Sequence, residues 1–257
     1  MKIITWNVNS IRARMERFLA YLEESRPDVM CLQETKVVDD HFPGEEIEAR
    51  GYRIERFGQR TYNGVAILSK AALKDVERGM PGDPDPSQAR VISASVAGIR
   101  LINVYVPNGS EVGSEKFAYK LAWLECLRGY VDKAVSRDSS LLILGDFNIA
   151  PEDRDVYDPD AWRGQVLFHP DEHRALREIQ KLGLVDAFRL HHEEGGLYSW
   201  WDFRGGMFWK NQGLRIDLVL LSKSLVDRCR SAEIDRSMRK GKQPSDHAPV
   251  VVDIAED

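Results

Sequence analysis

Polar side chains interrupt or follow apolar stretches at six places in this chain, and their residue types suit catalysis. They are Asn7 with Asn9, Gln33 with Glu34, Tyr105, Asp146 with Asn148, Asp217, and Asp246 with His247. Asp and Asn are common where strands turn, so one such place would indicate only a turn. Six in one chain predict strand ends that converge on a common site.

The oxygen donors in this group suit a hard divalent cation. Asn7, Glu34, Asp146, Asn148 and Asp246 offer carboxylate and carbonyl oxygens, which Mg²⁺ and Mn²⁺ prefer in octahedral geometry. Asp146 and Asn148 are two residues apart, so in an extended chain their side chains point the same way. The group lacks the usual Cys/His ligand set of zinc and the Ser with a nearby base of an acyl-transfer site.

Asp217 and His247 form a candidate carboxylate–imidazole pair. Asp217 lies inside the apolar stretch 216–221, where an unpaired buried charge is costly and a partner is needed. A carboxylate fixes the tautomer of a neighbouring imidazole and raises its basicity. With a divalent cation, an acid/base carboxylate and the Tyr105 phenol, this pair predicts phosphodiester hydrolysis. The cation neutralises charge on a phosphate oxygen, and a carboxylate activates water for in-line attack.

The stretches that position these residues alternate between strand and helix patterns. Short stretches rich in Val and Ile predict strands at 2–8, 28–32, 64–68, 90–96, 100–106, 141–144, 216–221 and 249–254. Helical spacing of apolar residues predicts helices over 11–25, 117–135 and 170–182. Ala97-Gly98 predicts a tight hairpin, so the sheet is not purely parallel. Packed sheets covered by helices are therefore expected. No GxGxxG or GxxxxGK[ST] motif follows any predicted strand, so a nucleotide cofactor is not expected.

The composition of the 257 residues, 43% hydrophobic and 30% charged, is that of a globular protein. No break in composition marks a linker, so one domain over 1–257 is expected. The chain has no apolar stretch near the roughly 20 residues of a membrane span and no signal-peptide pattern, which predicts a cytoplasmic protein without a membrane partner. Net charge is −5, yet residues 203–242 hold ten Lys and Arg against four acidic residues, a local charge of +6. Such a basic surface can bind a polyanion.

Nine short motifs, in order along the chain, carry a resemblance to a known family. They are 4–9 (ITWNVN), 32–36 (LQETK), 62–66 (YNGVA), 105–108 (YVPN), 144–148 (LGDFN), 183–188 (GLVDAF), 198–202 (YSWWD), 213–217 (GLRID) and 244–249 (PSDHAP). The sequence resembles the exonuclease III family of apurinic/apyrimidinic (AP) endonucleases nearly end to end. That family lies within the exonuclease–endonuclease–phosphatase superfamily, which includes DNase I.

The resemblance implies a DNase I-like α/β fold, a four-layer sandwich of two mainly antiparallel sheets flanked by helices. It implies Mg²⁺-dependent cleavage 5′ to abasic sites in duplex DNA, with Mn²⁺ able to substitute. It also implies 3′→5′ exonuclease action and removal of 3′-phosphate or 3′-phosphoglycolate blocks at nicks and ends. A monomeric enzyme of base excision repair is expected.

The resemblance also implies a metal site centred on Glu34, with Asn7 close to it. The remaining metal ligands expected from the family are Asp146, Asn148, Asp246 and His247.

Catalytic roles are implied for five residues. Asp146 would activate water or serve the leaving oxygen as an acid, and Asn148 would orient the water or stabilise the transition state. Tyr105 would contact the scissile phosphate or protonate the leaving group. Asp217 would orient His247, which would bind a phosphate oxygen.

DNA contacts are implied at six positions of the sequence. Arg90 and Lys120 match basic positions of the family, and Asn108 matches a contact to phosphate or sugar. Trp200, Trp201 and Leu214 match an apolar pocket for a flipped-out abasic sugar, whose extrusion costs least where the base is missing. Neighbours in a strand face opposite ways, so one tryptophan should lie in the core and the other in the pocket.

Several rivals remain at this point. A general nuclease like DNase I would usually have histidine in place of Tyr105, and phosphoinositide phosphatases or sphingomyelinases would lack the 198–202 and 213–217 motifs. A non-catalytic nucleic-acid-binding regulator on this fold would lack Glu34, Asp146 or the Asp217–His247 pair. A specialised 3′-end processing enzyme with weak AP endonuclease activity is the nearest rival. The expected loop 157–169 would then set the balance, with the small Gly164 leaving room for an extruded sugar.

Overall fold

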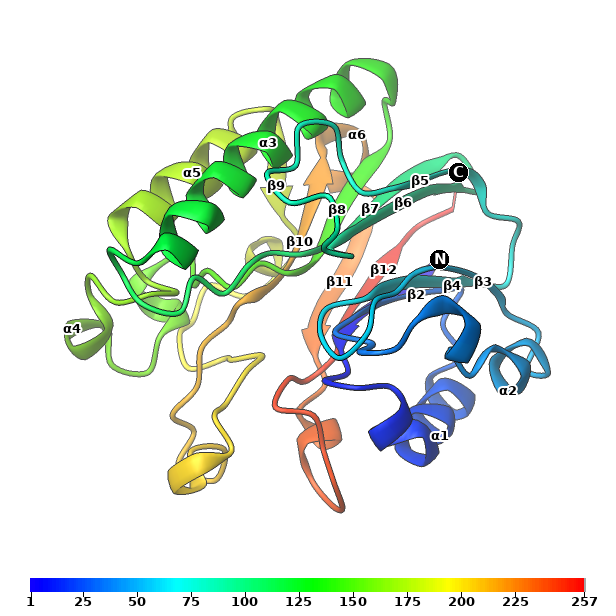
Figure 1. Ribbon diagram of the computed structural model, residues 1–257, viewed down its shortest axis with the longest axis horizontal. Helices are drawn as coiled ribbons and strands as arrows, with labels where there is room; N and C mark the ends of the chain where they lie inside the picture. The colour runs from blue at the N-terminus through cyan, green and yellow to red at the C-terminus, as the bar shows by residue number, and fades with distance from the viewer. Residues whose placement is uncertain (257) are drawn as a thin grey trace.

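Two six-stranded sheets pack face to face in the computed structural model, which describes residues 1–256 (Figure 1). The first sheet has the order β11-β12-β1-β2-β4-β3 and the second β5-β6-β7-β8-β10-β9. The first comprises β1 (Lys2–Asn7), β2 (Val29–Gln33), β3 (Arg53–Phe57), β4 (Val65–Ser69), β11 (Cys229–Ile234) and β12 (Val250–Ile254). The second comprises β5 (Lys74–Arg78), β6 (Val91–Val96), β7 (Ile99–Tyr105), β8 (Leu141–Asp146), β9 (Leu184–Asp186) and β10 (Asp217–Ser222).

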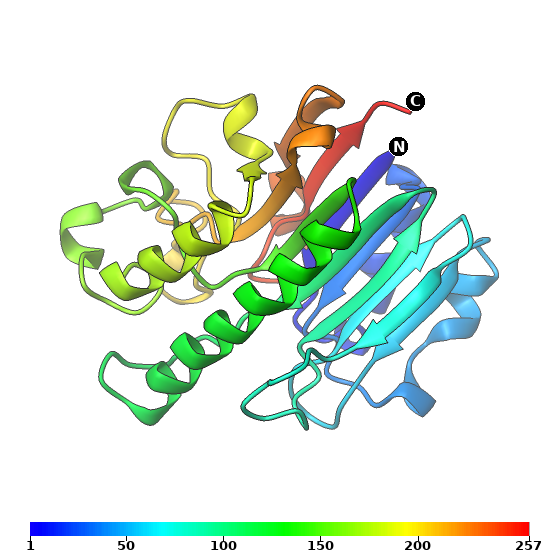
Figure 2. The same ribbon diagram turned by 90° about the horizontal axis from the view of Figure 1, so that it is seen from above.

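Helices cover the outer face of each sheet. The first sheet packs against α1 (Met15–Ser25) and α2 (Gly44–Glu48), and the second against α3 (Glu115–Arg137) and α5 (Pro170–Gln180) (Figure 2). Two shorter helices are α4 (Pro159–Trp162) and α6 (Lys223–Val226). The arrangement confirms the expected four-layer sandwich. Within residues 1–256, no helix has the length and apolar character needed to cross a membrane.

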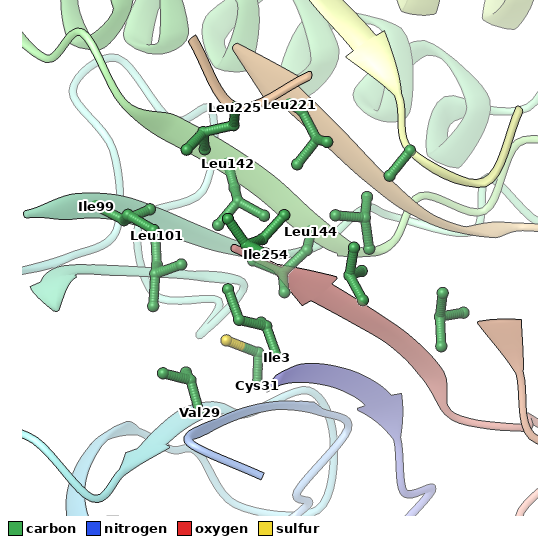
Figure 3. Packing of buried hydrophobic residues seen from close by; sticks show 14 of the residues in the cluster. Ile3, Val29, Cys31, Ile99, Leu101, Leu142, Leu144, Leu221, Leu225 and Ile254 are labelled. Carbon is green, nitrogen blue, oxygen red and sulfur yellow. The ribbon is translucent and has the colours of Figure 1, made fainter. Parts of the chain in front are cut away.

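The core forms because central strands are apolar on both faces. In β8, Leu142 and Leu144 face the other sheet, in the cluster that also holds Ile3 and Val29 (Figure 3), whereas Leu141 and Ile143 face the helices. This alternation is the two-residue period of a strand. Each sheet therefore has one helix-covered face and one face in the shared core.

The strand directions bring the polar strand ends together. Each sheet has one parallel pair, β1–β2 in the first and β7–β8 in the second, and β12 and β10 run antiparallel to β1 and β8. The carboxyl ends of β1, β2, β7 and β8 thus lie at the same end as the starts of β10 and β12. In the second sheet, Tyr105 pairs with Asp146 and Asp146 with Asp217 across three neighbouring strands.

All eight expected strands and all three expected helices are present. The first helix begins as a 3₁₀ turn at Arg12–Arg14, and Ala97-Gly98 forms the expected hairpin turn with positive φ at both residues. The sequence missed β3, β5, β9 and β11, and each of these is an edge strand. The expected loop 157–169 contains α4, and a 3₁₀ turn (Asp153–Asp155) precedes it.

Candidate active site

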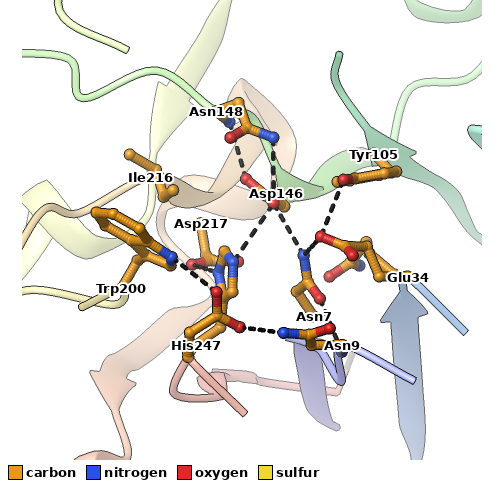
Figure 4. A network of polar contacts seen from close by, with 12 residues as sticks. Asn7, Asn9, Glu34, Tyr105, Asp146, Asn148, Trp200, Ile216, Asp217 and His247 are labelled. Carbon is orange, nitrogen blue, oxygen red and sulfur yellow. Dashed lines mark hydrogen bonds and ion pairs between the residues drawn. The ribbon is translucent and has the colours of Figure 1, made fainter. Parts of the chain in front are cut away.

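The strand-end residues gather into one polar network at the end of both sheets (Figure 4). Asn7 ends β1, Tyr105 ends β7, Asp146 ends β8 and Asp217 begins β10. Gly145 makes the close approach at Asp146 possible, because a Cβ there would lie 2.0 Å from the Val104 carbonyl oxygen. The backbone at this point in β8 therefore requires glycine.

Glu34 follows β2 and is held from three sides. Its Oε1 accepts hydrogen bonds from Asn7 Nδ2 at 3.0 Å and from the Tyr105 hydroxyl at 2.9 Å. Its Oε2 lies 2.7 Å from Lys36 Nζ. Burial alone would raise the pKa of Glu34, but Lys36 and Asn7 outweigh it and hold the pKa below its usual value. Glu34 is therefore an ionised carboxylate at neutral pH.

Asp146 lies between the two sheets' contributions to the site. Its Oδ2 accepts from Asn7 Nδ2 at 3.0 Å and lies 3.7 Å from His247 Nε2. Its Oδ1 accepts the backbone N–H of Asn148, whose side-chain amide also donates to the Val106 carbonyl. Burial raises the pKa of Asp146 to about 7, with His247 opposing the rise and Asp217 adding to it. A carboxylate with a pKa near neutrality can exchange a proton with water.

Asp217 and His247 make the expected pair. His247 Nδ1 lies 2.8 Å from Asp217 Oδ2, and the same oxygen accepts from Ser199 Oγ at 2.6 Å. Burial alone would lower the pKa of His247, but Asp217 and Asp146 raise it to about 10. The imidazole is therefore charged at neutral pH, with Nδ1 bound to Asp217 and Nε2 turned toward Asp146.

Asp246 joins the network from the other side. Its Oδ1 accepts from Asn9 Nδ2 at 2.9 Å, and its Oδ2 accepts from Trp200 Nε1 at 3.1 Å. Burial alone would raise the pKa of Asp246, but His247, Asn9 and Trp200 lower it below its usual value. Asp246 is separated from Glu34 by Asn9 and Lys36, whose Nζ donates to Asn9 Oδ1 at 2.6 Å.

These residues fit a divalent cation. Asp146 and Asp217 each place a carboxylate oxygen within 4.8 Å of the other, and Glu34 is one hydrogen bond from Asn7, which also bonds Asp146. Asp217 Oδ1 is buried and has no hydrogen-bond partner among residues 1–256. An orphaned carboxylate oxygen among further carboxylates is the environment that a hard cation stabilises.

Arg90 and Asn108, two of the expected DNA contacts, lie beside Tyr105 at the edge of the site. They border a hollow of about 220 Å³ beside Tyr105, together with Lys116. The Arg90 guanidinium lies 4.8 Å from the centre of the Tyr105 ring and donates to the Tyr105 carbonyl. Asn108 Nδ2 donates to Asn148 Oδ1 at 3.1 Å. The hollow thus presents positive charge and amides next to the Tyr105 phenol.

Three expected DNA contacts are corrected by burial. Lys120, Trp201 and Leu214 each have 0% of their surface exposed. Lys120 is paired with Glu172, Trp201 packs against Tyr198 and Phe208, and Leu214 lies in an apolar cluster beneath Trp200. None of the three has surface to offer DNA. The expectation of one tryptophan in the core is met by Trp201, while the partly exposed Trp200 faces the site.

The basic stretch 203–242 is also less exposed than its charge suggests. Arg215 is 1% exposed and pairs with Asp155 and Asp186, and Arg239 is 5% exposed and donates to the Ser245 carbonyl. Two of the ten basic side chains therefore hold the loops together rather than face a polyanion.

Two residues at the site escaped the sequence reasoning. Lys36 forms an ion pair with Glu34; it lay inside the 32–36 motif of the resemblance, two residues after a candidate ligand, but no role was expected of it. Ser199 donates to Asp217 and accepts the Ile216 and Asp217 amides. It lay inside a motif of the resemblance, but no periodic pattern distinguished it.

Comparisons with known proteins show the family and the fold to which the chain is similar. A model of the Endonuclease/Exonuclease/phosphatase family matches residues 4–247. The exodeoxyribonuclease III of Haemophilus influenzae is 37% identical over 262 residues, covering 97% of this chain and 98% of that protein. The structure of the 3′ phosphatase NExo from Neisseria, bound to a product DNA hairpin, has a TM-score of 0.98 at 41% identity, with 100% of both chains covered. An AP endonuclease from Archaeoglobus fulgidus has a TM-score of 0.95 at 40% identity, with 99% of both chains covered.

Proposed function

The chain belongs to the Endonuclease/Exonuclease/phosphatase family, and from this premise we propose that it is a DNA-repair phosphodiesterase. It cleaves duplex DNA 5′ to abasic sites and acts on 3′ ends as an exonuclease and 3′-phosphatase. The observation that carries the proposal is the position of Asp146, whose Oδ2 lies 3.0 Å from Asn7 Nδ2 and 3.7 Å from His247 Nε2. It joins the Glu34 side of the site to the Asp217–His247 pair.

The protein's own residues divide the work around the phosphate. Asp146, with a pKa of about 7, takes the proton of the attacking water, and the Asn148 amide orients that water. His247, charged and held by Asp217, binds a non-bridging phosphate oxygen. Burial, Glu34 and Asp146 raise the pKa of Tyr105 well above its usual value, so the phenol keeps its proton and donates to the phosphate or the leaving oxygen.

We assign Mg²⁺ as the cation, with Mn²⁺ as a substitute. Glu34 and Asn7 are its principal ligands in this proposal, and Asp146, Asn148, Asp246 and His247 border the same space. The ion supplies charge neutralisation on the phosphate oxygens when bound. The donor set of hard oxygens supports this choice over zinc.

The substrate is duplex DNA with abasic sites, nicks or blocked 3′ ends. Arg90 and Asn108 contact phosphate or sugar next to the site, and Trp200 lines the side that receives the extruded sugar. The enzyme acts as a monomer in the cytoplasm, on nucleoid DNA. Gel filtration at working concentration tests the oligomeric state, and fractionation of source cells tests the location.

A second function is favoured by one observation. The Neisseria relative that matches this chain at 41% identity is described as a 3′ phosphatase. A chain specialised for 3′ ends would remove a 3′-phosphate efficiently and incise abasic sites weakly. The same strand-end residues serve both reactions, so the loops around them decide the ranking.

One assay separates these functions. A labelled duplex with a single tetrahydrofuran abasic analogue and a matched duplex with a 3′-phosphate at a nick are each incubated with Mg²⁺ and with EDTA. Mg²⁺-dependent incision 5′ to the analogue is the expected result. Removal of the 3′-phosphate without incision would identify the specialised processor, and duplex binding without any turnover would identify a non-catalytic regulator.

A further inference from the structure

A fully buried ion pair lies behind the active site, outside the assigned chemistry. Lys120 of α3 donates to Glu172 Oε1 of α5, and both side chains have 0% of their surface exposed. Burial lowers the pKa of Lys120, and Glu172 opposes this shift. Two charges removed from water are retained only where good geometry and further hydrogen bonds compensate.

The further hydrogen bonds of Lys120 go to the catalytic side. Its Nζ donates to the Asn148 carbonyl at 2.7 Å and to the Asn108 carbonyl at 3.1 Å. The ammonium therefore fixes the turn after β8 and the loop after β7 with one group. A Cβ on Gly109 would lie 3.1 Å from Lys120 Cδ and 3.2 Å from Val166 Cγ2. The loop after β7 is therefore packed closely against α3.

The further hydrogen bonds of Glu172 go to the end of the 157–169 loop. Its Oε1 accepts the Leu167 amide at 3.2 Å, and its Oε2 accepts the His169 amide at 3.0 Å. Leu167 has a φ of 76°, a conformation that costs free energy for a side chain of this kind. The Leu167 carbonyl accepts a hydrogen bond from the Ala150 amide at 2.8 Å. This bond links the 157–169 loop directly to the turn that carries Asn148.

We propose that Lys120 and Glu172 form a positioning pair that couples the Asn148 turn to the 157–169 loop and sets the relative rates on abasic and 3′-blocked DNA. The inference rests on the proposed function. Lys120 acts on both reactions, because both use Asn148. Glu172 acts mainly on abasic incision, because Leu167 and Phe168 pack with Trp200 in the apolar cluster beside the site.

The kinetic test uses Lys120→Met and Glu172→Gln. Lys120→Met should lower kcat on both substrates by about 10–100-fold, the cost of a misplaced catalytic group, without weakening duplex binding. Glu172→Gln keeps an acceptor oxygen and removes the charge, and it should lower abasic incision more than 3′-phosphate removal.

Arg100→Met is the matched control. Arg100 is 2% exposed and pairs with Glu77, at the end of β7 opposite Tyr105. The Arg100→Met substitution removes a buried cation at a distance from the site, so it should lower thermal stability and leave kcat on both substrates unchanged.

Hydrogen exchange gives a readout independent of turnover. Lys120 makes no hydrogen bond to the Leu167 or His169 amide. If Lys120 and Glu172 act together, Lys120→Met should nevertheless speed hydrogen exchange at both amides. Arg100→Met should not change exchange there.

Three results would overturn the inference. The first is that Lys120→Met keeps the wild-type kcat and the wild-type rate of hydrogen exchange. The second is that Arg100→Met loses as much kcat as Lys120→Met at the same loss of thermal stability. The third is that Glu172→Gln lowers kcat equally on both substrates. Should Lys120→Met not fold, Glu172→Gln carries both the kinetic and the exchange test. A wild-type chain that cleaves neither substrate would contradict the proposed function, and the exchange measurement would still decide the coupling.

Discussion

The floor of the active site and its rim are built differently. Under the proposed function, the floor supplies the chemistry and the rim sets the choice of substrate. The floor comprises the strand-end residues Asn7, Glu34, Tyr105, Asp146, Asp217 and His247, and the rim comprises the loops 157–169, 203–212 and 236–243. Floor side chains hydrogen-bond across the two sheets, as Asn7 does to Glu34 and Asp146. On the rim, Phe203 and Trp209 are 53% and 76% exposed, and Figure 1 shows the 203–212 and 236–243 segments extending beyond the sheet ends. Sheet register fixes the floor, whereas loops can change without disturbing it.

Removing the metal should give the largest effect, because it acts on the floor as a whole. EDTA should lower both abasic incision and 3′-phosphate removal by roughly a thousandfold or more, since the cation supplies several kcal/mol of charge stabilisation. Rates are followed on labelled duplexes, and excess Mg²⁺ should restore both. Turnover that persists in EDTA would mean that the carboxylate cluster does not hold an essential ion.

A single floor substitution should come next. His247→Ala removes the charged imidazole held by Asp217, and kcat should fall by about 10²–10⁴-fold while duplex Kd stays the same. His191→Ala is the matched control, because His191 contacts Cys229 away from the floor. Equal kcat in the two variants would place the phosphate-binding group elsewhere.

A rim substitution should change the choice of substrate rather than the chemistry. Gly164 has a φ of 81° and no heavy atom within 4 Å of the position of a Cβ, so the space there is open. Gly164→His should lower abasic incision by about tenfold and spare 3′-phosphate removal, because a large side chain hinders the extruded sugar. Gly164→Ala carries the same backbone strain without the bulk and isolates that cost. If the two variants match, strain and not bulk is responsible.

The smallest effect is expected at the tip of the rim. Trp209→Ala should raise the duplex Kd by about fivefold and leave kcat alone, since an exposed aromatic ring adds a fraction of the roughly 1–3 kcal/mol of a full base stack. Fluorescence anisotropy measures it, with Leu190→Ala as an exposed apolar control. An unchanged Kd would remove Trp209 from the DNA surface.

The same contrast explains how far the sequence could be interpreted. The central strands were predictable because both of their faces are buried. Four consecutive apolar residues in β8 (LLIL) and in β10 (LVLL) indicate this burial. The four missed strands lie at sheet edges, where β3 (RIERF) and β5 (KDVER) carry charges on exposed faces and resemble loops. Pairing with an inner neighbour, which no local pattern records, makes them strands.

The floor was predictable from strand ends, but the direction of single side chains was not. The resemblance assigned Lys120 to DNA as a basic position of the family, although it is three residues after Phe117 and four before Leu124, on the buried face of α3. That spacing was a usable signal, because a lysine on an apolar face needs an acidic partner. Its partner Glu172 lies 52 residues away along the chain, and only the fold brings the two together.

Under the proposed function, one floor performs both reactions and the rim determines which substrate is preferred. The most direct measurement is the single-turnover rate of Asp146→Asn on the abasic duplex and on the 3′-phosphate duplex, under the same Mg²⁺ conditions. Both rates should fall by the same large factor, about 10²–10⁴-fold, with duplex binding retained. A rate that persists on one substrate while the other is lost would contradict it, because the two reactions would then use different groups.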